Sequence, residues 1–188
     1  MKRAASILPL LVLCLAAPLA GASAETGFQL GIPALNFPDD PRVDGLRLSL
    51  LYGKNERTEG LDLGFLSLSQ SSERRGLALV LGMSRVTGGS YGLSLSLVNV
   101  HDGTDEGMNL AFMNVLGDTP DGFNSGIATV ARGATGLDVS GFNMSQRSKV
   151  QVGFVNVTKE IETLQIGFFN FAENGFVPFF PLFNFPKR

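Results

Sequence analysis

Cysteine and tryptophan are the residues that this sequence most clearly lacks. Its 188 residues include no tryptophan and a single cysteine, Cys14, which lies in an apolar run near the N-terminus. A lone cysteine cannot form an intramolecular disulfide or a multi-thiolate metal site. Packing and hydrogen bonding must therefore hold the fold together without covalent cross-links.

Histidine is equally scarce, because His101, which is followed by Asp102, is the only one. Without histidine or cysteine neighbours it cannot supply a histidine-based metal cluster or activate a thiol nucleophile. A Ser-His-Asp triad is arithmetically possible, but no G-x-S-x-G phrase marks a nucleophilic serine. We expect His101 to be a solvated turn residue, and we predict no catalytic residues, no metal and no cofactor.

Charge of either sign is sparse and evenly mixed. The formal net charge is −2, and the sequence contains no run of Lys and Arg that would indicate a nucleic-acid partner.

The first residues have the features of an export signal. Lys2 and Arg3 precede the apolar run 7–19, and Ala22-Ser23-Ala24 forms a small-x-small cleavage pattern. The run is shorter than the roughly 18–20 residues that cross a bilayer, which makes a permanent anchor the weaker interpretation. We therefore predict a signal peptide over 1–24 and export to the periplasm, outer membrane or cell surface of a bacterium.

After this segment the sequence repeats one nine-residue phrase nine times. Clear copies are GLSLSLVNV (92–100), GMNLAFMNV (107–115) and KVQVGFVNV (149–157). The copies begin at Gly45, Gly60, Gly76, Gly92, Gly107, Gly122, Gly136, Lys149 and Thr163. Such a fixed period of similar phrases is typical of a stacked repeat architecture.

Each position of the phrase keeps its own chemistry. Positions two, four and six are mostly apolar, whereas position three is almost always polar, which is the period of two of a strand with one buried face. We expect the apolar positions to fill the core and position three, including Asp62 and Asp138, to face water. Position five is small in eight copies, which indicates a tight bend or a close neighbouring backbone.

Asparagine dominates position eight. It occurs there as Asn99, Asn114, Asn143, Asn156 and Asn170. Asparagines stacked at the ~4.8 Å strand spacing can hydrogen-bond along the stack. Met83 and Thr129 occupy this position in two copies and place the continuity of the row in doubt.

Two architectures fit these phrases: an all-β parallel β-solenoid of about nine repeats of 13–16 residues, and an antiparallel outer-membrane β-barrel. In an antiparallel meander the asparagines would fall on alternating rims, so no row could form. The connections also show no alternation of short and long loops. We therefore predict the solenoid, with corners where positions six and seven are both apolar.

Proline-bounded phrases lie near both ends of the repeats, at 33–38 and 181–186. Because proline removes a backbone donor and stops ladder growth, we expect an N-terminal cap over 25–44, the repeat domain over 45–175 and an aromatic C-terminal cap over 176–188. The alternative for this tail is membrane or partner docking through Phe176, Phe179 and Phe180.

Carboxylates cluster in two successive turns. Asp102, Asp105 and Glu106 lie in one, and Asp118 and Asp121 lie in the next. Stacked coils could bring them together around calcium, but the spacing matches neither an EF-hand nor the glycine-rich calcium nonapeptide, so we expect solvated turns. Asp62 and Asp138 are five repeats apart, which argues against a carboxylate-lined cleft of a glycan hydrolase.

Three stretches resemble a family of bacterial exported surface-repeat proteins built from G-L-Q-x-G-x-x-N phrases and ending in an NGF-x-P-x-FP-x-FNF tail. They are GLRLSLLYGKN (45–55), GLDLGFLSLS (60–69) and LQIGFFNFAENGFVPFFPLFNF (164–185). The resemblance implies a repeat fold and a location outside the cytoplasm, and it assigns no biochemical activity.

These observations predict a non-catalytic structural or interaction protein of the cell envelope. We expect it to offer the polar face formed by position three to an envelope or surface partner, or to further copies of itself. The alternative function is that of a small outer-membrane barrel protein.

Overall fold

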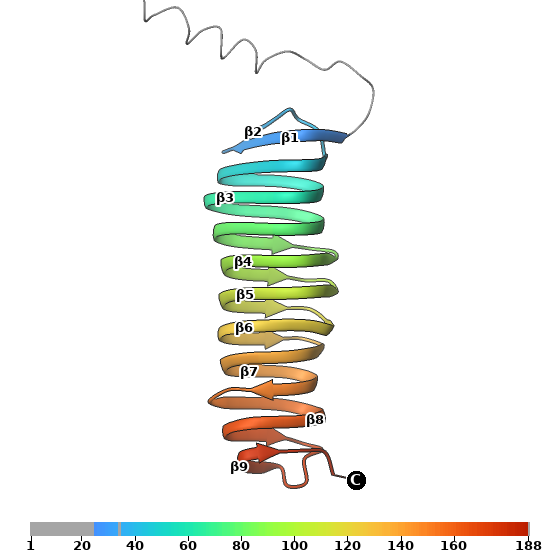
Figure 1. Ribbon diagram of the computed structural model, residues 1–188, viewed down its shortest axis with the longest axis vertical. Coiled ribbons are helices and arrows are strands. Elements are labelled where there is room, and N and C mark those ends of the chain that lie inside the picture. Colours follow the sequence, from blue (N-terminus) through green and yellow to red (C-terminus); the bar gives the residue numbers. More distant parts are fainter. Residues whose placement is uncertain (1–24, 34, 188) are drawn as a thin grey trace, which may run out of the picture.

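The computed structural model describes residues 25–33 and 35–187, so the predicted signal peptide lies outside the described residues. The described residues form one nine-stranded sheet that coils into a flattened solenoid (Figure 1). Its strands are β1 (Glu25–Ile32), β2 (Leu35–Phe37), β3 (Arg42–Val86), β4 (Ser90–His101), β5 (Asp105–Leu116), β6 (Thr119–Ala131), β7 (Ala134–Val152), β8 (Val155–Ala172) and β9 (Phe179–Asn184).

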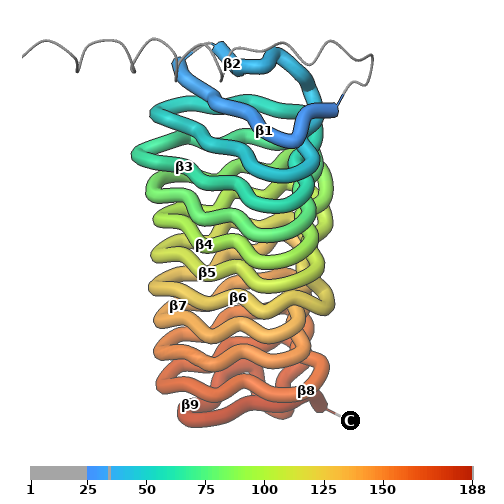
Figure 2. Tube along the Cα trace, turned by 45° about the horizontal axis from the view of Figure 1, so that its top comes forward, coloured from blue at the N-terminus to red at the C-terminus, as the bar shows by residue number. Residues whose placement is uncertain are grey.

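Successive coils pair in parallel with equivalent phrase positions directly above one another (Figure 2). Gly76 pairs with Gly92 and Gly92 with Gly107, and the same register continues through β5, β6, β7 and β8. The parallel solenoid is therefore confirmed, and the antiparallel alternative is wrong.

Glycine opens the phrase because two backbones meet there. Gly107 has a φ of 137°, and a Cβ at this position would lie 2.0 Å from the carbonyl oxygen of Gly92 in the preceding coil. Other residues rarely adopt such a φ, and any side chain would collide with that oxygen. The stacked glycines thus let adjacent coils approach closely.

The two ends carry antiparallel strands. β2 pairs antiparallel with β1, and β9 folds back antiparallel along β8. The segment that precedes the first phrase also contributes a partial coil, because Phe28, Gln29 and Leu30 pair in parallel with Leu46, Arg47 and Leu48.

The orientation of the side chains is the reverse of the sequence prediction. Position three is buried, and polar side chains outnumber apolar ones several-fold among the buried residues. The leucines and phenylalanines of positions two, four and six point outward and are exposed or half-buried. The expected leucine core is therefore wrong, because the coil interior is narrow and is filled by small or hydrogen-bonding side chains.

Candidate functional site

The predicted asparagine row is present, and it lies inside the solenoid. Asn99 Nδ2 donates to Asn114 Oδ1 at 3.0 Å, and Asn156 Nδ2 donates to Asn170 Oδ1 at 2.7 Å. These bonds offset the cost of burying the amides. These residues stabilise the stack and have no access to a partner. The row is interrupted after Thr129, whose hydroxyl bonds Ser140, and Asn143 Oδ1 has no partner among the described residues.

A β-bulge changes which residue occupies this row in the phrase 76–84, where the sequence predicted an interruption at Met83. The register shifts between Val80 and Met83, so Ser84 pairs with Asn99 while Met83 points outward. Ser84 therefore takes the inward position that the phrase alignment gave to Met83. Thr129 keeps its place and accepts a hydrogen bond from Asn114 at 3.4 Å.

Position three forms a second inner row. Asn109 donates to Asn124 at 3.0 Å, and Asn124 donates to Asp138 Oδ1 at 2.8 Å. The prediction that Asp62 and Asp138 face water is wrong, since both are buried. Burial raises the pKa of Asp138 above its ordinary value, although Thr135 and Asn124 donate hydrogen bonds to it.

A buried charge cluster links three coils through His101. The Arg74 guanidinium contacts His101 Nε2 at 3.3 Å, and His101 Nδ1 lies 2.5 Å from Asp105 Oδ2. Arg74 also donates to Ser84 and Ser90, and Asn109 donates to Asp105. The prediction of a solvated His101 is wrong, because this side chain turns inward and completes the cluster.

The geometry of this cluster determines the protonation state of His101. Arginine can only donate, so Nε2 must accept and the proton of the neutral ring lies on Nδ1, facing Asp105. Burial lowers the pKa of His101 below its ordinary value of 6.5, and the nearby positive charge of Arg74 acts in the same direction. The hydrogen bond and charge of Asp105 oppose the shift without reversing it.

Because its folded-state pKa is lowered, His101 makes stability depend on pH. Below about 6.5 the unfolded chain binds a proton that the folded chain does not, so stability falls as pH decreases, by up to about 1.4 kcal/mol per pH unit. We expect the unfolding midpoint in urea to decrease more between pH 7.5 and 5.5 in the wild type than in His101→Gln.

Asp138 is present in both proteins, so its own titration cancels in this comparison. Glutamine can accept from Arg74 and donate to Asp105, which preserves the contacts without the titration. An equal decrease in both proteins would show that His101 does not titrate differently on folding.

A second buried ion pair lies in the first coils. Arg47 Nη1 is 3.5 Å from Asp62 Oδ2, and both side chains are buried. Ser69 donates to Asp62 at 2.6 Å and accepts from Arg47 at 3.0 Å. Of the two carboxylates considered for a hydrolytic cleft, Asp62 is thus enclosed in an ion pair, and Asp138 is held by hydrogen bonds from Asn124 and Thr135.

The outer surface carries the apolar side chains. We define the apolar half as the outward side chains at positions two, four, six, seven and nine of the phrases. Within it, positions six and seven form a corner ridge along the stack, where both consecutive residues point outward. Its most exposed members include Phe65, Leu66, Phe112, Ile127, Phe154 and Phe168.

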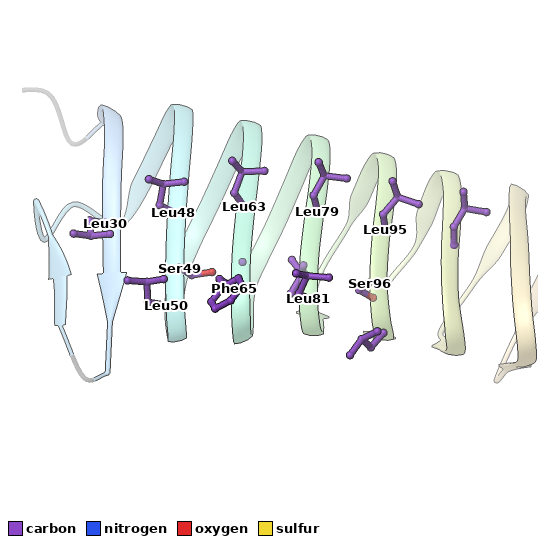
Figure 3. A pocket seen from close by; sticks show the side chains of 14 residues that line it. Leu30, Leu48, Ser49, Leu50, Leu63, Phe65, Leu79, Leu81, Leu95 and Ser96 are labelled. Atoms are coloured by element: carbon purple, nitrogen blue, oxygen red, sulfur yellow. The ribbon is translucent and has the colours of Figure 1, made fainter.

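A shallow groove of about 530 Å³ runs along one flank of the apolar half. It lies between the row of position four and the row of position six. Figure 3 shows Leu48, Leu63, Leu79 and Leu95 in the first row and Leu50, Phe65 and Leu81 in the second.

Exposed charge is absent from the apolar half of the described phrases 45–171. The only charged residues at positions two to nine are Arg47, Asp62 and Asp138, and all three are buried. Such an arrangement leaves an uncharged apolar surface along every coil.

The opposite side, which we call the charged edge, consists of the connectors between phrases (right-hand side of Figure 1). Asp102 lies there between Arg85 at 3.5 Å and Arg132 at 3.2 Å, and Arg147 pairs with Glu160 at 3.0 Å. Positive and negative groups alternate, so this edge has no strong field of one sign.

The acidic turns do not converge. Asp102 points outward to two arginines, whereas Asp105 points inward to His101. Within residues 25–33 and 35–187, no three His, Cys, Asp or Glu side chains are grouped so that they could hold a metal ion.

The aromatic tail packs against itself and the last coil. Phe176 lies 4.8 Å from Phe180 and 4.5 Å from Phe185, measured between ring centroids. Phe179 stacks 4.8 Å from Phe171 and remains exposed. Of the three predicted docking residues, Phe179 therefore continues the apolar half, while Phe176 and Phe180 are half-buried in the tail cluster.

Comparison with known proteins does not indicate a function for this chain. No family model, no curated protein and no solved structure matches the chain. The described part of the chain contains no helix of the length and apolarity needed to cross a membrane.

Proposed function

We propose that the chain is a non-catalytic interaction protein of the bacterial cell envelope whose contact surface is the apolar half of the solenoid. The observation that carries this proposal is the inverted arrangement of side chains. Monomeric soluble proteins rarely expose a contiguous apolar patch larger than a few hundred Å², and larger patches mark contact sites. Here apolar side chains line every coil.

The polar face suggested by the sequence cannot serve this role, because position three lies inside the coils. The buried state of Asp62, His101 and Asp138 likewise supports a non-catalytic role, since each is held by structural partners and none faces a cleft.

The proposal predicts that the apolar half governs association. We expect the full chain to bind a hydrophobic dye and to self-associate in sedimentation velocity without detergent. A variant with Phe65, Leu97 and Phe112 replaced by Gln should lose most of both properties, because these side chains are among the exposed members of the corner ridge. Far-UV circular dichroism should be unchanged.

A matched control replaces Glu106, Arg132 and Lys159 on the charged edge by Gln. It should retain the dye binding and association of the wild type. A wild-type chain that is monomeric without detergent and binds no dye would overturn the proposed function.

A further inference from the structure

The apolar half covers two flanks that meet at the corner ridge. Positions two, four and six lie on one flank, and positions seven and nine lie on the other. Phe112 and Met113 are consecutive and both exposed, which places them on either side of a corner. At the same corner, Leu51 and Leu66 have positive φ values of 63° and 47°. The result is a convex wedge with its apex at the ridge.

Exposed apolar side chains occur on both flanks of this wedge. Met108 at position two is 43% exposed on one flank, and Met144 at position nine is 45% exposed on the other. A flat partner surface, such as one flank of a second copy, would cover only one of them. A hydrocarbon phase that surrounds the apex would cover both.

The depth of the wedge fits half of a bilayer. Four residue steps from position two to position six span about 13 Å at ~3.3 Å per residue. One leaflet supplies about 15 Å of hydrocarbon, half of the ~30 Å core. Exposed charges begin at Lys149, at position one, on the first flank and at Lys54 and Arg85, just beyond position nine, on the second. Position ten lies three residue steps, about 10 Å, from the ridge, and the long Lys and Arg side chains span the remaining distance to the headgroups.

The backbone is compatible with this environment. Parallel coils exchange their N–H and C=O hydrogen bonds along the stack, so the flanks present side chains rather than unpaired backbone groups. An unpaired backbone group costs several kcal/mol in hydrocarbon. The mixture of charges on the opposite edge suits a headgroup region, where both signs find partners.

We propose that the solenoid inserts ridge-first into one leaflet of a lipid bilayer, with its stack axis in the membrane plane and its charged edge at the headgroups. This inference rests on the proposed function, because it names the partner of the same apolar half. Over nine coils at ~4.8 Å each, the buried ridge would be about 40 Å long.

Depth measurements test this geometry in the full chain with Cys14→Ser. Single cysteines replace Ile127 on the ridge, Met108 at position two or Arg132 on the charged edge, and each carries a fluorophore. The variants are mixed with vesicles of phosphatidylcholine and phosphatidylglycerol at a ratio of three to one. Lipids brominated at different depths report where each fluorophore lies.

We expect the protein to float with the vesicles. Residue 127 should be quenched best by bromines near the acyl chain ends, residue 108 by shallower bromines, and residue 132 only by aqueous iodide. Ile127→Lys should weaken vesicle binding about tenfold or more, since a charge deep in the leaflet is costly. Arg132→Lys should bind like the wild type.

Two results would overturn the inference. One is the absence of flotation, and the other is equal quenching depth at residues 127, 108 and 132. If dye binding and self-association persist without flotation, the proposed function stands and its partner is another copy of the chain. If dye binding and self-association are absent as well, both proposals fail.

Discussion

Replacing Arg74 by Met is expected to lower the free energy of unfolding by about 3–5 kcal/mol, because several buried groups lose a hydrogen-bond partner at about 1–3 kcal/mol each. The guanidinium is the donor to Ser84, Ser90 and His101 Nε2. Its loss leaves these three groups without their donor in a cluster that water does not reach. Chemical denaturation of the variant and the wild type measures the difference.

The neighbouring arginine provides the control. Arg75 is next in the chain and pairs with Glu73 at 3.0 Å, but its side chain is 53% exposed. Exposed ion pairs contribute about 0–1 kcal/mol, so Arg75→Met should change stability by no more than that. Equal losses in the two variants would contradict an interior location for Arg74.

Replacing Asn114 by Leu is expected to destabilise the solenoid strongly, although it adds an apolar side chain to the interior. Asn99 Nδ2 would lose its acceptor, and the Ser125 carbonyl would lose the donor that now lies 3.0 Å away. Each buried group without a partner costs about 1–3 kcal/mol, which predicts a loss of about 2–6 kcal/mol in denaturation experiments.

Phe112→Gln, two residues away on the same strand, is the matched comparison. Phe112 is 61% exposed, so this change should alter stability by only about 0.5 kcal/mol. An interior built from apolar residues would give the opposite order, with Phe112→Gln the more damaging substitution. Observation of that order would refute the polar interior.

The repeat period and the parallel stacking could be predicted because both follow from positional chemistry. In a parallel stack each residue lies between the equivalent residues of the coils above and below, so every phrase position must keep its chemical character. Asn99 and Asn114, which occupy the same position in successive phrases, meet this requirement. The register of the coils confirms this inference.

The direction of the side chains could not be obtained from alternation alone, since a period of two separates two faces without showing which one is inside. A signal was nevertheless present at position five. It shares its face with position three, and residues as small as Ser49 and Gly64 indicate the crowded side of the strand. Gly64 confirms this, because a Cβ there would lie 2.3 Å from Ser67 Oγ.

The cluster around His101 was missed for a different reason. His101 and Asp105 lie in one connector, whereas Arg74 lies in an earlier one, and the stacking of coils brings Arg74 to His101. Their spacing in sequence matches no motif. Knowledge that connector residues alternate inward and outward would have paired His101 with Asp105 rather than with Asp102.

Thiol accessibility tests the inverted interior most directly. In the folded full chain with Cys14→Ser, diluted until it is monomeric, single cysteines at positions 112 and 114 are reacted with N-ethylmaleimide, a small neutral reagent. Phe112→Cys should react at nearly the rate of an unfolded chain, and Asn114→Cys should react far more slowly. Rapid reaction at position 114 with protection at position 112 would contradict the account.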